Sequence, residues 1–135
     1  KGFCCPILSE TDQAPSAGCL VLKGNSVLLV QGLNGKVAPP GGKREPNESA
    51  KCTAYRETFE ETGMKAIPAN LIATFDTGFN LYACKLDPSE QIPKISRPLE
   101  VRSIIWLSPD EFSTETWRYP DQGDRIKELI PIPLK

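Results

Sequence analysis

The chain has 135 residues, which suits a single domain over residues 1–135 rather than two independent domains. Its 17 acidic and 16 basic residues nearly cancel, so the chain lacks the broad positive field that holds a polymeric nucleic acid. No apolar run approaches the roughly 20 residues that cross a bilayer, and we therefore expect no membrane span in this chain.

The first part of the chain predicts two strands followed by a loop. Residues 1–15 show no periodicity and are expected to form an irregular lead-in. Residues 17–23 and 26–31 are rich in Val and Leu, and the turn signal Gly24-Asn25 between them predicts a β-hairpin. Residues 32–42 are rich in glycine and contain two adjacent prolines, which predicts a shaped loop rather than a strand.

A helix is predicted from residue 48 or 49 to residue 62, because Pro46 and Asn47 supply a start and Gly63 supplies a stop. At about 100° per residue, the apolar side chains fall on one face of this helix. That face carries Cys52, Tyr55 and Phe59. The opposite face is mainly acidic and carries Thr53, Glu57, Glu60 and Glu61.

The remainder of the chain predicts further strands and a short final helix, with no internal repeat and no second domain. In chain order, the expected elements are strands at residues 70–76 and 80–86, a surface loop at 87–98, a strand at 101–107, a helical turn starting at Ser108-Pro109 and a helix at 124–130.

The chain has five cysteines and no histidine, and a structural zinc site is not expected because no Cys-x-x-Cys spacing occurs. Cys19, Cys52 and Cys84 lie in apolar or helical patterns, which favours small buried side chains over disulfides. In an oxidising compartment, Cys4 or Cys5 would be able to bridge one of them and leave an odd thiol. The sequence leaves open which of the cysteines form disulfides.

Three carboxylates gather on the predicted helix. Glu57, Glu60 and Glu61 stand at i, i+3 and i+4, which makes them neighbours on one face. The repulsion between them costs only a few tenths of a kcal/mol per pair, so a solvated acidic surface would tolerate it. Arg56, however, is placed to hold a carboxylate with two hydrogen bonds, and Glu48 lies at a suitable distance to accept them. This dense set of hard oxygen ligands favours magnesium or manganese over zinc.

The same stretch resembles the signature of the Nudix (MutT-like) hydrolase family, which is Gly, five residues, Glu, seven residues, Arg-Glu, an aliphatic residue, any residue, Glu-Glu, any residue, Gly and an aliphatic residue. The positions that match, with every spacing kept, are Gly42, Glu48, Arg56, Glu57, Glu60, Glu61, Gly63 and Met64. Thr58 departs, because the family prefers an aliphatic residue there, although the threonine methyl group can still pack. Val37 departs too, because many relatives carry a tryptophan near this position.

The resemblance implies the Nudix fold, an α+β arrangement (an α/β/α sandwich) in which a mixed β-sheet lies between helices. It also implies a divalent-metal-dependent hydrolase that cleaves the pyrophosphate bond of a nucleoside diphosphate linked to another moiety, such as a nucleotide, a nucleotide sugar or a (d)NTP. The metal ligands that it implies, for Mg2+ or alternatively Mn2+, are Gly42, Glu57, Glu60 and Glu61. The catalytic set that it implies is Arg56, Glu57, Glu60, Glu61 and Glu100, with Glu48 and Gly41 in support.

Several alternatives stay open. Glu100, six residues before Trp106, stands where several relatives carry a catalytic or additional metal-binding glutamate, but it fits an ordinary exposed charge equally well. Tyr82 is better explained as a strand aromatic than as a substrate contact. The aromatic residues that would be able to stack on a base are Phe79, Trp117 and Tyr119. The general base, the attacked phosphorus and the substrate are not determined by the sequence.

Two other functional classes compete with the enzyme. A catalytically silent Nudix-like nucleotide-binding module is disfavoured because all signature glutamates are present, and a non-enzymatic acidic-helix domain would make the spacing a coincidence. The expected partner is a small nucleoside diphosphate derivative, and a homodimer is left open. The family favours a bacterial cytoplasmic location, whereas the cysteine content and the missing initiator methionine fit an exported or periplasmic protein.

Overall fold

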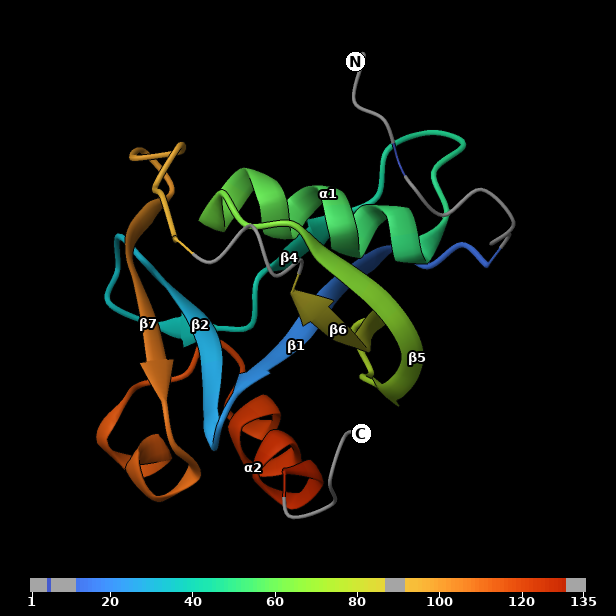
Figure 1. Ribbon diagram of the computed structural model, residues 1–135. Coiled ribbons are helices and arrows are strands. Elements are labelled where there is room, and N and C mark those ends of the chain that lie inside the picture. The colour runs from blue at the N-terminus through green and yellow to red at the C-terminus, as the bar shows by residue number, and fades with distance from the viewer. Residues whose placement is uncertain (1–4, 6–11, 87–91, 131–135) are drawn as a thin grey trace.

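The structure is a computed structural model of the chain that describes residues 5, 12–86 and 92–130 (Figure 1). Most of the lead-in expected at residues 1–15 therefore lies outside the described residues. In chain order, the described residues form β1 Ser16–Lys23, β2 Ser26–Gly32, β3 Val37–Ala38, β4 Gly41–Lys43, α1 Ala50–Thr62, β5 Ala66–Thr74, β6 Phe79–Leu86, β7 Val101–Leu107, the 3-10 helix η1 Pro109–Thr114 and α2 Pro120–Leu129.

Strand β1 organises the sheet. Its residues 16–21 pair in parallel with β6 on one side, and residues 16–18 pair antiparallel with β4 on the other. Its last two residues form the expected hairpin with β2. Strand β2 continues antiparallel to β3 and β7, and β5 is antiparallel to β6. One parallel pair among antiparallel pairs makes the sheet mixed, which confirms the prediction.

Alternation along β1 divides the core into two clusters. Leu20 contributes to one cluster, whereas its neighbours Cys19 and Val21 contribute to the other. The first cluster includes Ile126 of α2, and the second includes Ala54 of α1. Helix α1 therefore covers one face of the sheet and α2 the other, as Figure 1 shows, and the expected α/β/α sandwich is confirmed.

The glycine-rich segment contains two short strands where only a loop was expected. At Gly41, a Cβ atom would lie 2.7 Å from the carbonyl oxygen of Ala17 and 2.8 Å from Cα of Gly18. The missing side chains therefore let β4 pair closely with β1. Two expected boundaries were also too late, since β5 begins at Ala66 rather than residue 70 and α2 begins at Pro120 rather than residue 124.

The core-facing side of α1 differs from the prediction. Cys52 and Phe59 are only half-buried, and the small residues Ala50, Ala54 and Thr58 are fully buried instead. Small side chains let the helix approach the glycine-containing strands of the sheet. A periodicity argument that looks for large apolar residues misses such a face. The helix boundaries themselves are confirmed, because Ser49 caps the start and Gly63 adopts a left-handed conformation at the end.

Two disulfides are present, Cys5–Cys52 and Cys19–Cys84. The prediction that Cys19, Cys52 and Cys84 are unpaired is therefore wrong, whereas the alternative pairing of Cys5 with a core-edge cysteine is confirmed. Parallel pairing of β1 with β6 brings Cys19 and Cys84 to a Cα–Cα distance of 5.5 Å, which no local pattern reveals.

Among the described residues, no helix is long and apolar enough to cross a membrane.

Thr58, the departure from the signature, is fully buried in α1, so its methyl group does pack as expected. Its hydroxyl group has no hydrogen-bond partner among the residues that the structure describes. Thr62, one turn later and equally buried, instead donates its hydroxyl hydrogen to the Thr58 carbonyl oxygen and accepts from the Met64 N–H. A buried hydroxyl without a partner costs about 1–3 kcal/mol.

We expect Thr58→Val to raise the free energy of unfolding by about 1 kcal/mol, because a methyl group replaces the unpaired hydroxyl at nearly the same volume. Thr62→Val is the matched control, and it should lower stability by about 1–2 kcal/mol because two hydrogen bonds are lost. Urea unfolding measures both. A loss of stability in Thr58→Val as large as that in Thr62→Val would contradict this account.

Candidate active site

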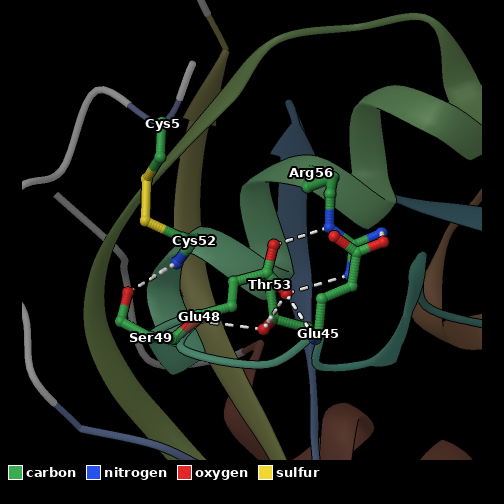
Figure 2. Close-up of a disulfide and its surroundings, with 7 residues drawn as sticks. All are labelled: Cys5, Glu45, Glu48, Ser49, Cys52, Thr53 and Arg56. Atoms are coloured by element: carbon green, nitrogen blue, oxygen red, sulfur yellow. Dashed lines mark hydrogen bonds and ion pairs between the residues drawn. A yellow bond between two sulfur atoms is a disulfide. The ribbon is translucent and has the colours of Figure 1, made fainter. Parts of the chain in front are cut away.

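The site is built on a bidentate ion pair between Arg56 and Glu48. The Arg56 Nε atom donates to Glu48 Oε2 over 2.6 Å, and Nη2 donates to Oε1 over 2.9 Å. Nη2 also donates to the carbonyl oxygen of Lys43 over 3.0 Å. The guanidinium thus ties the segment before α1 to the middle of the helix (Figure 2). This confirms the clamp that the sequence predicted.

Glu48 is held by two further donors. The Thr53 hydroxyl donates to Glu48 Oε1 over 2.8 Å, and the Glu45 backbone N–H donates to the same oxygen over 2.9 Å. Burial acts to raise the pKa of Glu48, but the hydrogen bonds from Arg56, the Glu45 N–H and Thr53 outweigh it, so this pKa lies below its usual value. Glu48 is therefore a stable anion that fixes the arginine.

The third nitrogen of Arg56 reaches the acidic residues of α1. Its Nη1 atom donates to Glu57 Oε2 over 3.2 Å and to Glu60 Oε1 over 3.0 Å. Because Arg56 is buried, these contacts fix the orientation of both carboxylates. One guanidinium thus links three glutamates of the signature.

Glu57 lies against the bare backbone of Gly42. A Cβ atom at this glycine would lie 2.5 Å from the Glu57 carboxyl carbon, so any side chain there would displace the carboxylate. Burial raises the pKa of Glu57, although the neighbouring Arg56 charge opposes the shift. Gly42 therefore gives the Glu57 carboxylate the space that it occupies.

Glu61 is the most strongly perturbed acid of the cluster. The Gly41 backbone N–H donates to Glu61 Oε1 over 3.1 Å. Burial raises the pKa of Glu61 to about 8, and the Gly41 hydrogen bond only partly opposes that shift. This glutamate has no salt bridge to a basic side chain among the described residues, so a cation beside it would relieve a real cost of burial.

A second arginine, Arg97, enters the cluster and was not predicted. Its guanidinium forms an ion pair with Glu60 and lies 3.8 Å from Glu57 and 3.3 Å from Glu100. The sequence contained no signal for this contact, because Arg97 lies in the expected surface loop, far from α1 along the chain.

Glu100, the candidate acid beyond the signature, is brought to the site. It lines a groove of about 550 Å³ together with Glu61. The described lining residues come mainly from β2, the segment after it and the start of β7, and they are Val30, Gln31, Gly32, Leu33, Asn34, Lys36, Ala38, Leu99, Val101 and Arg118. The groove is thus next to the carboxylates and holds two cationic side chains.

The aromatic candidates lie elsewhere. Phe79 packs against the first core cluster, Trp117 packs edge-on against Phe112, and Tyr119 is exposed outside the described groove lining. Tyr82 is buried within β6, which confirms that it is a strand aromatic. No aromatic side chain is found among the described residues that line the groove.

The type of ligand atom suits a hard divalent cation, because carboxylate oxygens lie beside the glycine backbone. In the part of the chain that the structure describes, however, no three such side chains converge closely enough to share one ion. Arg56 and Arg97 both form ion pairs with Glu60. An ion at Glu60 would therefore compete with these two guanidinium groups.

A model of the NUDIX domain family matches residues 12–129. The chain therefore belongs to the Nudix family, which confirms the resemblance seen in the signature and the expected class of enzyme, a Nudix hydrolase. No match was found among the curated protein sequences.

Three solved structures illustrate the shared fold. UDP-X diphosphatase has 20% identity and a TM-score of 0.71, over 93% of this chain and 66% of that chain. An ADP-ribose pyrophosphatase from Streptococcus suis has 18% identity and a TM-score of 0.71, over 89% and 92%. An Ap4A hydrolase from C. elegans has 20% identity and a TM-score of 0.65, over 86% and 94%. The chain spans about two thirds of the UDP-X diphosphatase, and at such low identities these likenesses show the fold.

We expect Glu48→Gln to lower the free energy of unfolding by about 2 kcal/mol at pH 7, because the buried Arg56 loses its anionic partner. The pKa of Glu48 is depressed below 4.5 in the folded chain, so its contribution is complete above that pH and is lost as the pH falls through the depressed value. The stability difference from wild type should therefore shrink on acidification below about pH 4.5.

Glu45→Gln is the matched control, because the Glu45 carboxylate is 56% exposed and 3.8 Å from Arg56. Its effect on stability should stay within about 0.5 kcal/mol. Urea unfolding across a pH series measures both variants. Equal effects of the two substitutions at pH 7 would rule out the clamp as a stabilising unit.

Proposed function

We propose that the chain hydrolyses the pyrophosphate bond of a small nucleoside diphosphate derivative in a reaction that depends on a divalent cation. The observation that supports it best is that Arg56 holds the carboxylates of Glu57 and Glu60, while Glu61, on the same helix, lines a groove of about 550 Å³. Glu61 adds to this argument, because burial raises its pKa and the described residues give its carboxylate no ion pair.

In this proposal, Glu57, Glu60 and Glu61 bind Mg2+, with Mn2+ as the alternative. When bound, the ion neutralises the anionic pyrophosphate and makes a coordinated water more acidic. Arg56 and Glu48 hold the ligands in position, while Gly41 and Gly42 let the backbone approach them. Phosphoryl chemistry depends mostly on such positioning and charge stabilisation.

The groove takes the remainder of the substrate. Lys36 and Arg118 line it and attract an anion, and the strongly exposed Leu33 and Leu99 offer apolar contact to a base or a sugar. Glu100 lines the same groove and is exposed, so it is the proposed acceptor of the proton from the attacking water. Full activity of Glu100→Gln across a pH series would exclude Glu100 from that role.

The proposed substrate class is a nucleoside diphosphate derivative, with the attached group left open. The three neighbouring structures are named for UDP-X, ADP-ribose and Ap4A, which differ in the groups attached to their phosphates. What these compounds share is a phosphate anhydride linked to a nucleoside. We therefore propose that shared chemistry and no single compound.

The direct test is a panel of nucleotides, dinucleoside polyphosphates and nucleotide sugars, incubated with the full chain and Mg2+. Hydrolysis of the anhydride yields two phosphorylated products, which chromatography resolves. Activity should require the cation and stop with a chelator. Nucleotide binding without turnover across the whole panel would favour a silent binding module, and neither binding nor turnover would contradict the proposal.

We expect Glu57→Gln, Glu60→Gln and Glu61→Gln each to lower turnover by about 100-fold or more, because each removes a charged oxygen from the proposed ion. Glu128→Gln, an exposed substitution on α2, is the control and should keep full activity. The stability of Glu61→Gln should be unchanged or higher, because burial disfavours the charge of this residue. Near-normal turnover in any of the three variants would remove that residue from the ligand set.

A further inference from the structure

Arg97 occupies the position where the carboxylates of α1 require positive charge. Its Nη2 atom pairs with Glu60 Oε1, and its Nη1 atom lies 3.8 Å from Glu57 and 3.3 Å from Glu100. No residue of the Nudix signature supplies this cation. The contact therefore belongs to this chain's own sequence outside the motif.

The segment that carries Arg97 is anchored to the last turn of α1. The Lys94 N–H donates to the Thr62 carbonyl oxygen over 2.7 Å, and the Ser96 hydroxyl donates to the Glu60 carbonyl oxygen over 2.7 Å. These are carbonyl groups at the end of the helix, which the helix itself leaves unpaired. The segment thus satisfies the C-terminus of α1 and delivers Arg97 to its acidic face.

The other end of the segment is fixed as well. The Arg97 carbonyl oxygen accepts hydrogen bonds from the N–H groups of Glu100 and Val101, over 2.9 and 2.8 Å, where β7 begins. The Arg97 backbone is therefore held between α1 and β7. Its side chain is 33% exposed and has several rotatable bonds, so the guanidinium can move while the backbone stays in place.

The contacts of Glu60 show why an ion and Arg97 compete. Glu60 Oε1 already accepts from Arg56 Nη1 and from Arg97 Nη2, so two positive charges lie beside this carboxylate. A divalent cation that binds this carboxylate would be repelled by both guanidinium groups, so its binding favours the departure of one of them. Arg56 is buried and held by Glu48 and the Lys43 carbonyl oxygen, whereas Arg97 is partly exposed.

We propose that Arg97 is an intramolecular counter-ion of the cation site, which neutralises Glu57 and Glu60 when no ion is bound and leaves them when a divalent cation binds. This inference rests on the proposed function, because it takes the same glutamates as the ligands. Glu100, which Arg97 also contacts, keeps the displaced guanidinium at the edge of the groove. Arg97 thereby sets the affinity for the cation and stabilises the site in its absence.

The test is Mn2+ binding to the full chain by calorimetry and by electron paramagnetic resonance, at fixed pH and low ionic strength. Arg97→Gln should bind Mn2+ about threefold to fivefold more tightly than wild type, because the competing ion pair is gone. Without metal, its melting temperature should fall by about 2–4 °C, and Mn2+ should restore more stability to it than to wild type. Arg97→Lys keeps the charge and should remain close to wild type.

Arg102→Gln is the matched control, because it removes the same charge from an exposed position on β7 that makes no ion pair among the described residues. This control measures how much the Mn2+ affinity rises simply because the protein has lost one positive charge. If Arg97→Gln binds Mn2+ no more tightly than Arg102→Gln, the counter-ion proposal is wrong.

The two proposals fail in distinguishable ways. If wild-type binding of Mn2+ depends on Glu60 and substrate is hydrolysed, but Arg97→Gln matches the control, only the role of Arg97 is contradicted. If wild type and Arg97→Gln both fail to bind Mn2+, the cation site and its counter-ion are contradicted together.

Discussion

The buried guanidinium of Arg56 is the constraint on which the site depends. Arg56 is only 4% exposed, so the N–H donors of its guanidinium need partners inside the protein. They donate hydrogen bonds to Glu48, Glu57, Glu60 and a backbone carbonyl oxygen. These contacts couple the segment before α1 to the helix and set the directions of the carboxylates. The disulfide Cys5–Cys52 is attached one turn before Arg56, so a covalent link lies beside the same part of the helix (Figure 2).

The charge balance of the cluster follows from that constraint. Five carboxylates, those of Glu48, Glu57, Glu60, Glu61 and Glu100, stand near two guanidinium groups. Burial then disfavours the charge of Glu57 and Glu61 and raises the pKa of both carboxyl groups. In the proposed function, a bound divalent ion supplies the missing positive charge. In this proposal, the burial of these carboxylates thus costs stability and favours the binding of a cation.

Local patterns predicted the parts of the structure that local forces determine. The hairpin, the caps of α1, strand β7 and the Arg56–Glu48 clamp all follow from residues close together in the chain or from a fixed signature. The disulfide Cys19–Cys84 and the contact of Arg97 with Glu60 depend instead on long-range packing, which no spacing encodes. The core face of α1 was missed because it is made of alanine and threonine, and a hydrophobic periodicity does not detect such small residues.

The central claim is that the carboxylates of α1 form a divalent-cation site. Anomalous diffraction from crystals of the full chain grown with Mn2+ tests it most directly, because it locates the ion without assuming an activity. The account predicts an anomalous peak within about 2.0–2.3 Å of carboxylate oxygens of Glu57, Glu60 and Glu61, with the Arg97 guanidinium no longer on Glu60. A structure at saturating Mn2+ with no peak between these residues, and with Arg97 still paired to Glu60, would contradict it.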